Sequence, residues 1–413
     1  MMNIFFFLST LFILGYGDPY ISRLSQFKRG ETATFDAAET GAKLYVASSD
    51  DNDYLKNIVI VSGATTTTLD TLNGYITGNT PKSLTITAGM SLRTSNSDTV
   101  TNVLTGYIYI TTSEQANDPL FSVLVLKNKQ AVSTINGNST VVVLNTELVT
   151  DSSDIDKPSK TSYVSDINQS ADTDMNFHWG IPPSNWTKVT ENQFFENPLY
   201  FKNFDENSQT WNSTRTFFDH VEPLQIGLDY WYITTVGSVA MIMENKYVSN
   251  YDYTTTSVNS TGLIVNSFLY QQHVVNFLLD YTRNRTVGTL ITTFPNSNDY
   301  ISFYLEEKRG AMIIQNYNKE GYVLHALMTT YMQASQLTIN STSLLPGVFY
   351  CQYYGFTSNL LPVPPSTAIQ TTLTTPSTTM GSSTTTVATT TKLSSANSII
   401  QLISMIVAFV LFR

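Results

Sequence analysis

Short apolar runs rich in β-branched and aromatic residues, broken by polar turns, recur along the first third of the chain and are typical of β-strands. They occur at 42–48, 57–62, 84–87, 106–112, 120–126 and 140–145, with Gly, Asn, Asp and Ser between them. Within 106–112, two tyrosines alternate with two isoleucines, and this period of two predicts a strand with one buried and one exposed face. No stretch here has a helical period. The pattern predicts a β-sandwich over residues 18–150.

Beyond this region the pattern first weakens and then returns. Residues 151–174 are polar and predict a linker between domains. In residues 175–361, expected strands lie at 198–204, 230–235, 238–243, 287–294 and 300–305. The last is followed by a charged, Gly-containing tip and by residues 311–316, which predicts a hairpin. We expect strands in 263–281, whereas 323–337 fits strands or short amphipathic helices.

The expected fold is therefore all-β, with two tandem antiparallel β-sandwiches, CUB-like or jelly-roll-like, at 18–150 and 175–361. A disordered Thr/Ser/Pro-rich stalk at 362–398 follows them. Its composition is typical of an O-glycosylated spacer.

The two ends of the chain predict secretion and membrane attachment. Residues 1–17 contain an eleven-residue apolar run followed by small residues, which predicts a signal peptide. The apolar tail, 399–413, is shorter than the roughly 20 residues of a spanning helix. Small residues, a polar spacer and such a tail indicate a GPI anchor. Candidate attachment residues are Gly381, Ser383, Ala388 and Ser394. A single-pass membrane helix is the alternative, and either way the protein is expected on the extracellular face of the plasma membrane.

The charge composition of the chain disfavours a nucleic-acid partner, and its sequons predict glycosylation. Charged residues make up 13% of the chain and the formal net charge is −10. Nucleic-acid binding needs a surplus of Lys and Arg, so a nucleic-acid partner is not expected. Seven Asn-x-Ser/Thr sequons are plausible glycan acceptors in a secreted chain. They are Asn138, Asn168, Asn185, Asn212, Asn259, Asn284 and Asn340.

The single cysteine, Cys351, lies in an apparent strand. No intramolecular disulfide can form. The thiol is therefore either packed in the core as a small apolar group or paired with a second chain in a disulfide-linked dimer.

Catalytic and metal motifs are not evident, and we expect neither an enzyme nor a cofactor. The acidic run Asp50–Asp53 lacks the EF-hand register and is better explained as a turn. Glu306 and Glu307 belong to the charged hairpin tip. The histidines His178, His220, His273 and His325 lie in no recognisable catalytic motif.

The aromatic residues are better candidates for ligand binding. The four tryptophans lie among Asn, Asp and Thr, a combination that suits ring stacking and directional hydrogen bonds to sugar hydroxyls. Trp186, inside a sequon, and Trp211 are the candidate ligand-stacking residues. The alternative is that Trp231 and its neighbours form core.

The layout of a signal peptide, cysteine-poor β-modules and a Thr-rich tail resembles nematode secreted CUB-like proteins. The expected strands at 43–48 and 57–62 lie at positions similar to those of such modules. The single cysteine and the lack of Trp before Trp179 differ from a typical CUB-like module. The resemblance implies an epithelial or immune-response surface protein without catalysis. We therefore expect a surface glycoprotein for recognition or adhesion, with an unidentified glycan, microbe or protein ligand. A structural coat glycoprotein is the alternative, and a secreted hydrolase is a third candidate.

Overall fold

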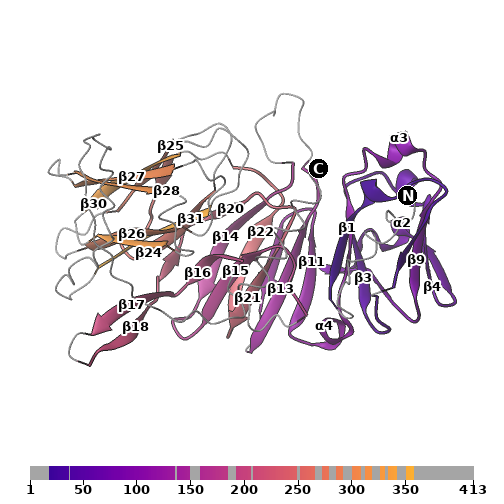
Figure 1. Ribbon diagram of the computed structural model, residues 1–413, viewed down its shortest axis with the longest axis horizontal. Helices are drawn as coiled ribbons and strands as arrows, with labels where there is room; N and C mark the ends of the chain where they lie inside the picture. The colour runs from indigo at the N-terminus through magenta and orange to yellow at the C-terminus, as the bar shows by residue number, and fades with distance from the viewer. Residues whose placement is uncertain are drawn as a thin grey trace, which may run out of the picture. The chain divides into compact units, whose positions relative to one another are not determined.

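The computed structural model of the protein describes fourteen segments of the chain. These are residues 18–36, 38–134, 137–148, 159–184, 192–205, 208–248, 252–265, 272–278, 285–291, 300–307, 312–318, 326–330, 334–341 and 350–357. The chain divides into two compact units, residues 1–365 and 366–413, and every described residue lies in the first. The described part is built almost entirely of β-strands, which confirms the all-β prediction (Figure 1).

The first sandwich packs two four-stranded antiparallel sheets. One has the order β1 (Tyr20–Arg23), β10 (Tyr107–Ile110), β3 (Lys43–Ala47), β8 (Ser83–Thr85), and the other β2 (Thr32–Phe35), β9 (Met90–Thr94), β4 (Ile58–Ser62), β5 (Thr65–Thr68). Short elements connect them: η1 (Leu24–Gln26), α1 (Asn52–Leu55), α2 (Leu69–Leu72), β6 (Tyr75–Thr77), β7 (Thr80–Pro81), α3 (Asp98–Thr101) and α4 (Ser113–Asn117). Alternate residues such as Leu44, Ile60 and Ile108 fill the core between the sheets.

The second sandwich pairs a five-stranded with a four-stranded sheet. The five-stranded sheet, called here the β21 sheet, has the order β11 (Phe121–Leu126), β13 (Asn138–Asn145), β21 (Tyr230–Val236), β15 (Asp174–Trp179), β16 (Gln193–Asn197). The facing sheet has the order β12 (Gln130–Ser133), β22 (Val239–Glu244), β14 (Ser162–Gln169), β20 (Leu224–Ile226). Strands β11 and β13 are parallel. Trp231 is fully buried in the core, as the core interpretation predicted.

Strand β19 and the described strands beyond residue 250 form a third pair of sheets with its own core. One sheet has the order β19 (His220–Val221), β24 (Ser260–Val265), β31 (Tyr350–Thr357), β26 (Arg285–Ile291), β29 (Ala326–Thr330). The other has the order β23 (Asp252–Thr254), β25 (Gln272–Asn276), β30 (Ala334–Ser341), β27 (Tyr300–Glu307), β28 (Met312–Asn318). The predicted β27–β28 hairpin is confirmed. Residues 263–281 contribute strands as expected, and 323–337 contributes β29 and part of β30.

This arrangement differs from the expectation of two sandwiches joined by a polar linker at 151–174. Strands β11 and β13 were grouped with the first domain but pair in the β21 sheet. Within the expected linker, residues 162–169 form β14. The apolar pattern of β14 is weak because a polar residue, Ser162, occupies a fully buried position where an apolar one would be expected. The Ser162 hydroxyl donates to Asn145 Oδ1 at 2.7 Å and accepts from Trp231 Nε1 at 3.1 Å, so the buried polar group is satisfied.

A separate two-stranded hairpin, β17 (Leu199–Asp205) and β18 (Thr210–Thr216), follows the second sandwich's β16. At its base, Leu199 and Phe201 pack with Phe218 and with Tyr354 of β31. The third sandwich is also joined to β16 by Gln352, which is fully buried. Its side-chain amide accepts from the Glu196 backbone N–H at 3.0 Å and donates to the Glu196 carbonyl at 2.7 Å.

Candidate functional site: the outer face of the β21 sheet

The outer face of the β21 sheet changes character between β13 on one side and β15 and β16 on the other. Because side chains alternate in a strand, Val141 and Val143 enter the core while Val142 and Leu144 lie on the outer face. There they pack with Tyr232 and with Tyr107 and Tyr109 of the first sandwich. One face of β10 was expected to be exposed, but all four of its residues are buried because this second apolar surface covers the tyrosines.

Further along the same face, polar side chains replace the apolar ones. We call Asp174, Asn176, Gln193, Glu196 and Thr234 the polar strip. The pairing of Asn176 with Thr234 on one side and Glu196 on the other brings them onto one face. Gln193 is buried, and the other four are half-buried. Gln193 Nε2 donates to Glu196 Oε2 at 2.7 Å and to Asn176 Oδ1 at 3.2 Å.

The Glu196 carboxyl has an altered acidity. Burial raises its pKa to about 7, the hydrogen bond from Gln193 opposes this rise, and the negative charge of Asp174 adds to it. The uncharged acid is therefore favoured on this part of the face well above the pH at which a solvated Glu ionises.

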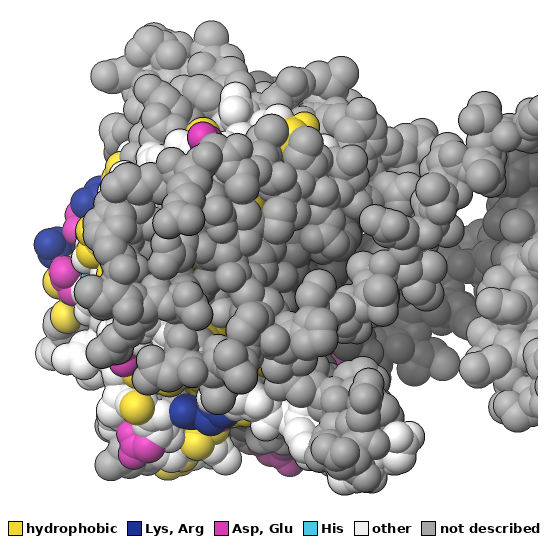
Figure 2. All heavy atoms as spheres, turned by 90° about the vertical axis from the view of Figure 1, so that its left-hand side faces the viewer, with side chains coloured by type: hydrophobic (Ala, Val, Ile, Leu, Met, Phe, Trp, Pro, Cys, Tyr) yellow, Lys and Arg dark blue, Asp and Glu magenta, His cyan; other side chains and the backbone are white. Residues whose placement is uncertain are grey.

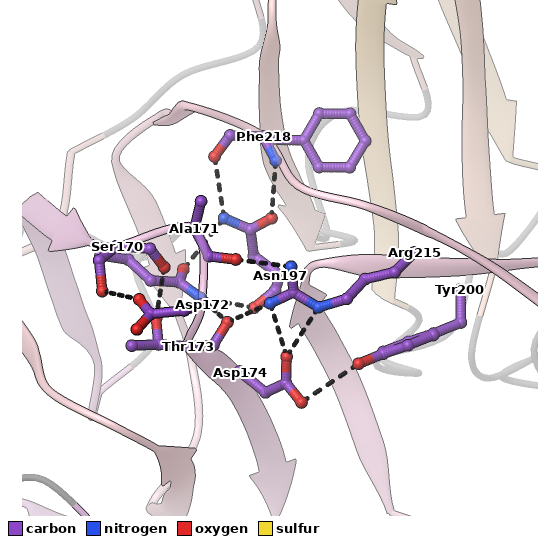
Figure 3. Close-up of polar contacts among 10 residues, drawn as sticks. Ser170, Ala171, Asp172, Thr173, Asp174, Asn197, Tyr200, Arg215 and Phe218 are labelled. Atoms are coloured by element: carbon purple, nitrogen blue, oxygen red, sulfur yellow. Dashed lines mark hydrogen bonds and ion pairs between the residues drawn. The ribbon is translucent and has the colours of Figure 1, made fainter.

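A cluster of three side chains marks the end of the strip (Figure 3). Arg215 Nη2 donates to Asp174 Oδ1 at 2.9 Å, and the Tyr200 hydroxyl donates to Asp174 Oδ2 at 3.2 Å. The Tyr200 ring remains 43% exposed. Val236 of β21, which pairs with Asp174 of β15, is 50% exposed. The cluster thus presents an aromatic ring whose hydroxyl is fixed, beside a neutralised ion pair and an apolar side chain.

Arg215 also ties the hairpin to the turn that precedes β15. Its Nη1 donates to the Ala171 carbonyl at 2.6 Å and its Nη2 to the Thr173 carbonyl at 2.7 Å. Asn197 exchanges two hydrogen bonds with the Phe218 backbone (Figure 3). These contacts hold the base of the hairpin, and with it Tyr200, against the second sandwich.

The predicted glycan acceptors differ in their surroundings. Asn138, Asn168 and Asn212 are exposed. Asn259 is half-buried and its Nδ2 donates to Asp219 Oδ2 at 2.8 Å. Asn340 is half-buried in β30, and its Oδ1 is buried without a hydrogen-bond partner among the described residues. Asn185 and Asn284 lie outside the described residues.

Other predicted residues fall partly or wholly outside the described segments. Trp186 lies outside them, as do the signal peptide, the stalk, the tail and the anchor candidates Gly381, Ser383, Ala388 and Ser394. Trp211 pairs with Phe204 in the hairpin, and only its backbone is described. Sequence analysis did not single out Tyr200, Asp174 or Arg215. These residues lie in β17, β15 and β18, and nothing in the sequence next to each of them indicates that the three side chains meet.

Cys351 is fully buried in the core of the third sandwich. Burial raises the pKa of its thiol far above the ordinary value. This placement favours the interpretation of a packed thiol, because its sulfur has no access to a second chain while the sandwich is folded.

His220 lies beside a hydroxyl and an acid, the combination that a hydrolase would use. Its Nε2 is 2.7 Å from Thr256 Oγ1 and 3.4 Å from Glu222 Oε2. A nucleophilic triad needs the hydroxyl and the acid on opposite ring nitrogens. Here both approach the same nitrogen, so this cluster does not have the triad arrangement.

The acidic run at 50–53 connects β3 to β4, where a turn was expected, but Asn52 and Asp53 begin the short helix α1. Asp50 accepts from the backbone N–H groups of Thr105 and Gly106, and Asp51 caps α1. Among the described residues, no group of three His, Cys, Asp or Glu side chains could hold a metal ion.

On the side of the molecule drawn in Figure 2, the described Lys and Arg side chains lie close to Asp and Glu side chains. This view therefore shows no patch of a single charge among the described residues.

Comparison with known proteins gives a family for the chain. No curated protein matches it. A solved structure of the CUB1-EGF-CUB2 domains of rat MASP-1 is similar at 9% identity, over 56% of this chain and 99% of that chain. Its TM-score is 0.17, too low to support an inference about fold or function.

The model of a family described as "Glycoprotein: Transmembrane glycoprotein" matches residues 39–410. In the part of the chain that the structure describes, no helix has the length and hydropathy to cross a membrane. Because the match spans most of the sequence, the chain belongs to this transmembrane glycoprotein family.

Proposed function

We propose that this surface glycoprotein acts in recognition or adhesion, binding an extracellular ligand on the polar strip and the adjoining Tyr200. The observation that carries the proposal is the Tyr200–Asp174–Arg215 cluster. A ring that is 43% exposed and anchored by a 3.2 Å hydrogen bond loses little conformational freedom when a ligand stacks on it. Aromatic anchors of this kind are enriched among residues that dominate binding energy.

The attachment to the cell is part of the proposal. The short apolar tail supports a GPI anchor on the extracellular face of the plasma membrane, and the family supports membrane association. Phosphatidylinositol-specific phospholipase C should release the protein from intact cells. Retention after treatment, with a known GPI protein released in parallel, would favour the single-pass alternative.

The binding test uses cells that display the full chain, with surface level measured by an epitope tag placed after residue 17. Adherence to other cells, to microbes and to matrix glycans is compared for the unaltered chain and Tyr200→Ala. We expect selective adherence that falls about tenfold or more in the variant, equivalent to about 1.4 kcal/mol. The matched control is Tyr54→Ala, because Tyr54 is 45% exposed on α1 of the first sandwich and should not affect adherence.

A structural coat glycoprotein is the second candidate, supported by the exposed sequons Asn138, Asn168 and Asn212. Equal adherence of the unaltered chain, both tyrosine variants and cells without the protein would contradict recognition. If removal of the sequons then altered surface hydration or packing, the coat function would be favoured.

A further inference from the structure

We infer that the ligand of the polar strip and Tyr200 is an uncharged oligosaccharide. This inference rests on the proposed recognition function and adds the chemical class of the ligand. It follows from three properties of the outer face of the β21 sheet: its hydrogen-bonding groups, its charge balance and its exposed apolar surface.

The hydrogen-bonding groups are amides, carboxyls and a hydroxyl arranged on a sheet. Asn176 and Gln193 are joined at 3.2 Å and Gln193 and Glu196 at 2.7 Å, so the three side chains restrain one another. Each amide has both donor and acceptor atoms, and a carboxyl offers two oxygens. Neighbouring hydroxyls of a sugar ring also donate and accept, so a fixed row of such groups suits a saccharide better than an apolar ligand.

The charge balance disfavours an anionic ligand. Asp174 is paired with Arg215 at 2.9 Å, and the surroundings of Glu196 favour its uncharged form. Among the described side chains that bond to the polar strip, Arg215 is the cation, and Asp174 and two carbonyls already use its donors. A sulfate or carboxylate on a sugar would therefore find no available cation there, and the chain as a whole carries a formal charge of −10.

The apolar part of the site is small and stands at one end of the strip. Tyr200 and Val236 are about half exposed, and both adjoin Asp174 through a hydrogen bond and a strand pairing, respectively. The C–H face of a sugar ring can pack on such a surface while its hydroxyls reach the polar strip. The Asp174 bond restrains the Tyr200 ring, which favours stacking.

The experiment measures binding of fluorescent polymers of uncharged, sialylated and sulfated oligosaccharides to cells displaying the full chain. We expect an uncharged polymer to bind and the anionic ones to bind at least tenfold more weakly. Tyr200→Ala should lower binding of the uncharged polymer about tenfold or more, and Tyr200→Phe, which keeps the ring, should lower it less. Tyr54→Ala should leave it unchanged.

Preferential binding of sialylated or sulfated polymers would overturn the inference. Tyr200-dependent adherence to a ligand that survives periodate oxidation but is destroyed by protease would also overturn the inference. Adherence of the cells without binding of any uncharged polymer would overturn it as well. In those cases the proposed recognition function would stand. Loss of all binding in Asn138→Gln would also overturn it, because Asn138 pairs with Val236 and its own glycan would then be the occupant. Adherence and polymer binding that are both unaffected by Tyr200→Ala would contradict both proposals.

Discussion

The outer face of the β21 sheet has two halves that differ in chemistry although they belong to one sheet and both include residues of β21. In one half, Val142, Leu144 and Tyr232 are fully buried against tyrosines of the first sandwich. In the other, Asn176, Thr234 and Glu196 remain half-buried and polar. Permanent removal of apolar surface from water stabilises the folded protein. Amides and carboxyls instead keep their hydrogen-bonding capacity for water or a ligand.

The difference indicates which half is a permanent contact and which half can exchange partners. The permanent half also carries a polar contact, since the Tyr107 hydroxyl, with one hydrogen to donate, lies 2.5 Å from the Asn145 carbonyl oxygen and 2.6 Å from that of Asp229. The polar half is held mainly by side chains that restrain one another. Substitutions in the first half should therefore affect folding, and substitutions at the far end of the second should affect binding.

The largest expected effect is that of Tyr107→Ala. Tyr107 is 1% exposed, packs edge-on to Tyr230 at 5.9 Å, and lies beneath Lys160 Nζ at 5.4 Å from its centroid. Truncation leaves a cavity and removes the hydroxyl that the Asn145 and Asp229 carbonyls share. We expect a loss of about 3–5 kcal/mol in the free energy of unfolding, measured by urea denaturation. Tyr107→Phe, which removes only the hydroxyl, should cost about 1–2 kcal/mol.

The exposed Tyr54→Ala is the control for this measurement and should change stability by less than about 0.5 kcal/mol. If Tyr107→Ala were equally neutral, the contact between the first sandwich and the β21 sheet would not contribute to folding, and the proposed contrast between the halves would be wrong.

Sequence analysis identified many of the strands because an apolar, β-branched run bounded by polar turns is a local signal. The runs at 42–48 and 57–62 became β3 and β4. It could not show that both faces of β10 are buried, because Tyr–Ile alternation is the same whether the tyrosines meet water or another sheet. It also missed β14, since a buried serine satisfied by Asn145 and Trp231 resembles a polar linker residue.

The candidate site was harder to predict for a similar reason. Asp174 was placed in the expected linker, and Arg215, its partner, lies 41 residues away in the hairpin. Tyr200 fell within a predicted strand, where an aromatic residue is unremarkable as core. Only the pairing of β15 with β16, and the fold of the hairpin back onto the 170–173 turn, brings these residues together. The tryptophans were singled out for their residue type alone, and Trp231 proved to be core.

The next effect in size is the pH dependence contributed by Glu196. Its pKa is about 7 in the folded protein against an ordinary value of 4.5. Between these values the folded chain holds the proton and the unfolded chain has lost it. Stability should therefore fall as pH rises from about 4.5 to 7 and level off above 7. The shift corresponds to at most about 3 kcal/mol, and partial exposure reduces this to about 1–2 kcal/mol.

Glu196→Gln keeps the hydrogen bond from Gln193 but cannot ionise, so it should remove this component of the pH profile. Urea denaturation at pH 5 and pH 8 measures it, with the exposed Glu31→Gln as the control that leaves the profile unchanged. Parallel pH profiles for the unaltered chain and Glu196→Gln would show that Glu196 is ionised on the folded face, and one argument for an uncharged ligand would be lost.

The smallest effect on stability is expected for Arg215→Ala at the end of the polar strip. The Arg215–Asp174 pair is about one-third exposed, so its contribution is limited by solvent screening, and we expect a loss of about 1 kcal/mol in the free energy of unfolding.

The local effect of Arg215→Ala should be larger, because Arg215 also binds the carbonyls of Ala171 and Thr173. Hydrogen exchange at residues 170–174 should therefore accelerate, whereas exchange in β13 and β21 should stay slow. Arg215→Lys, which keeps the charge but not the planar fork, should protect the turn only in part. If exchange instead accelerated equally throughout the β21 sheet, the polar end would be a folding contact like the Tyr107 end, and the division of this face into a permanent and an exchangeable half would fail.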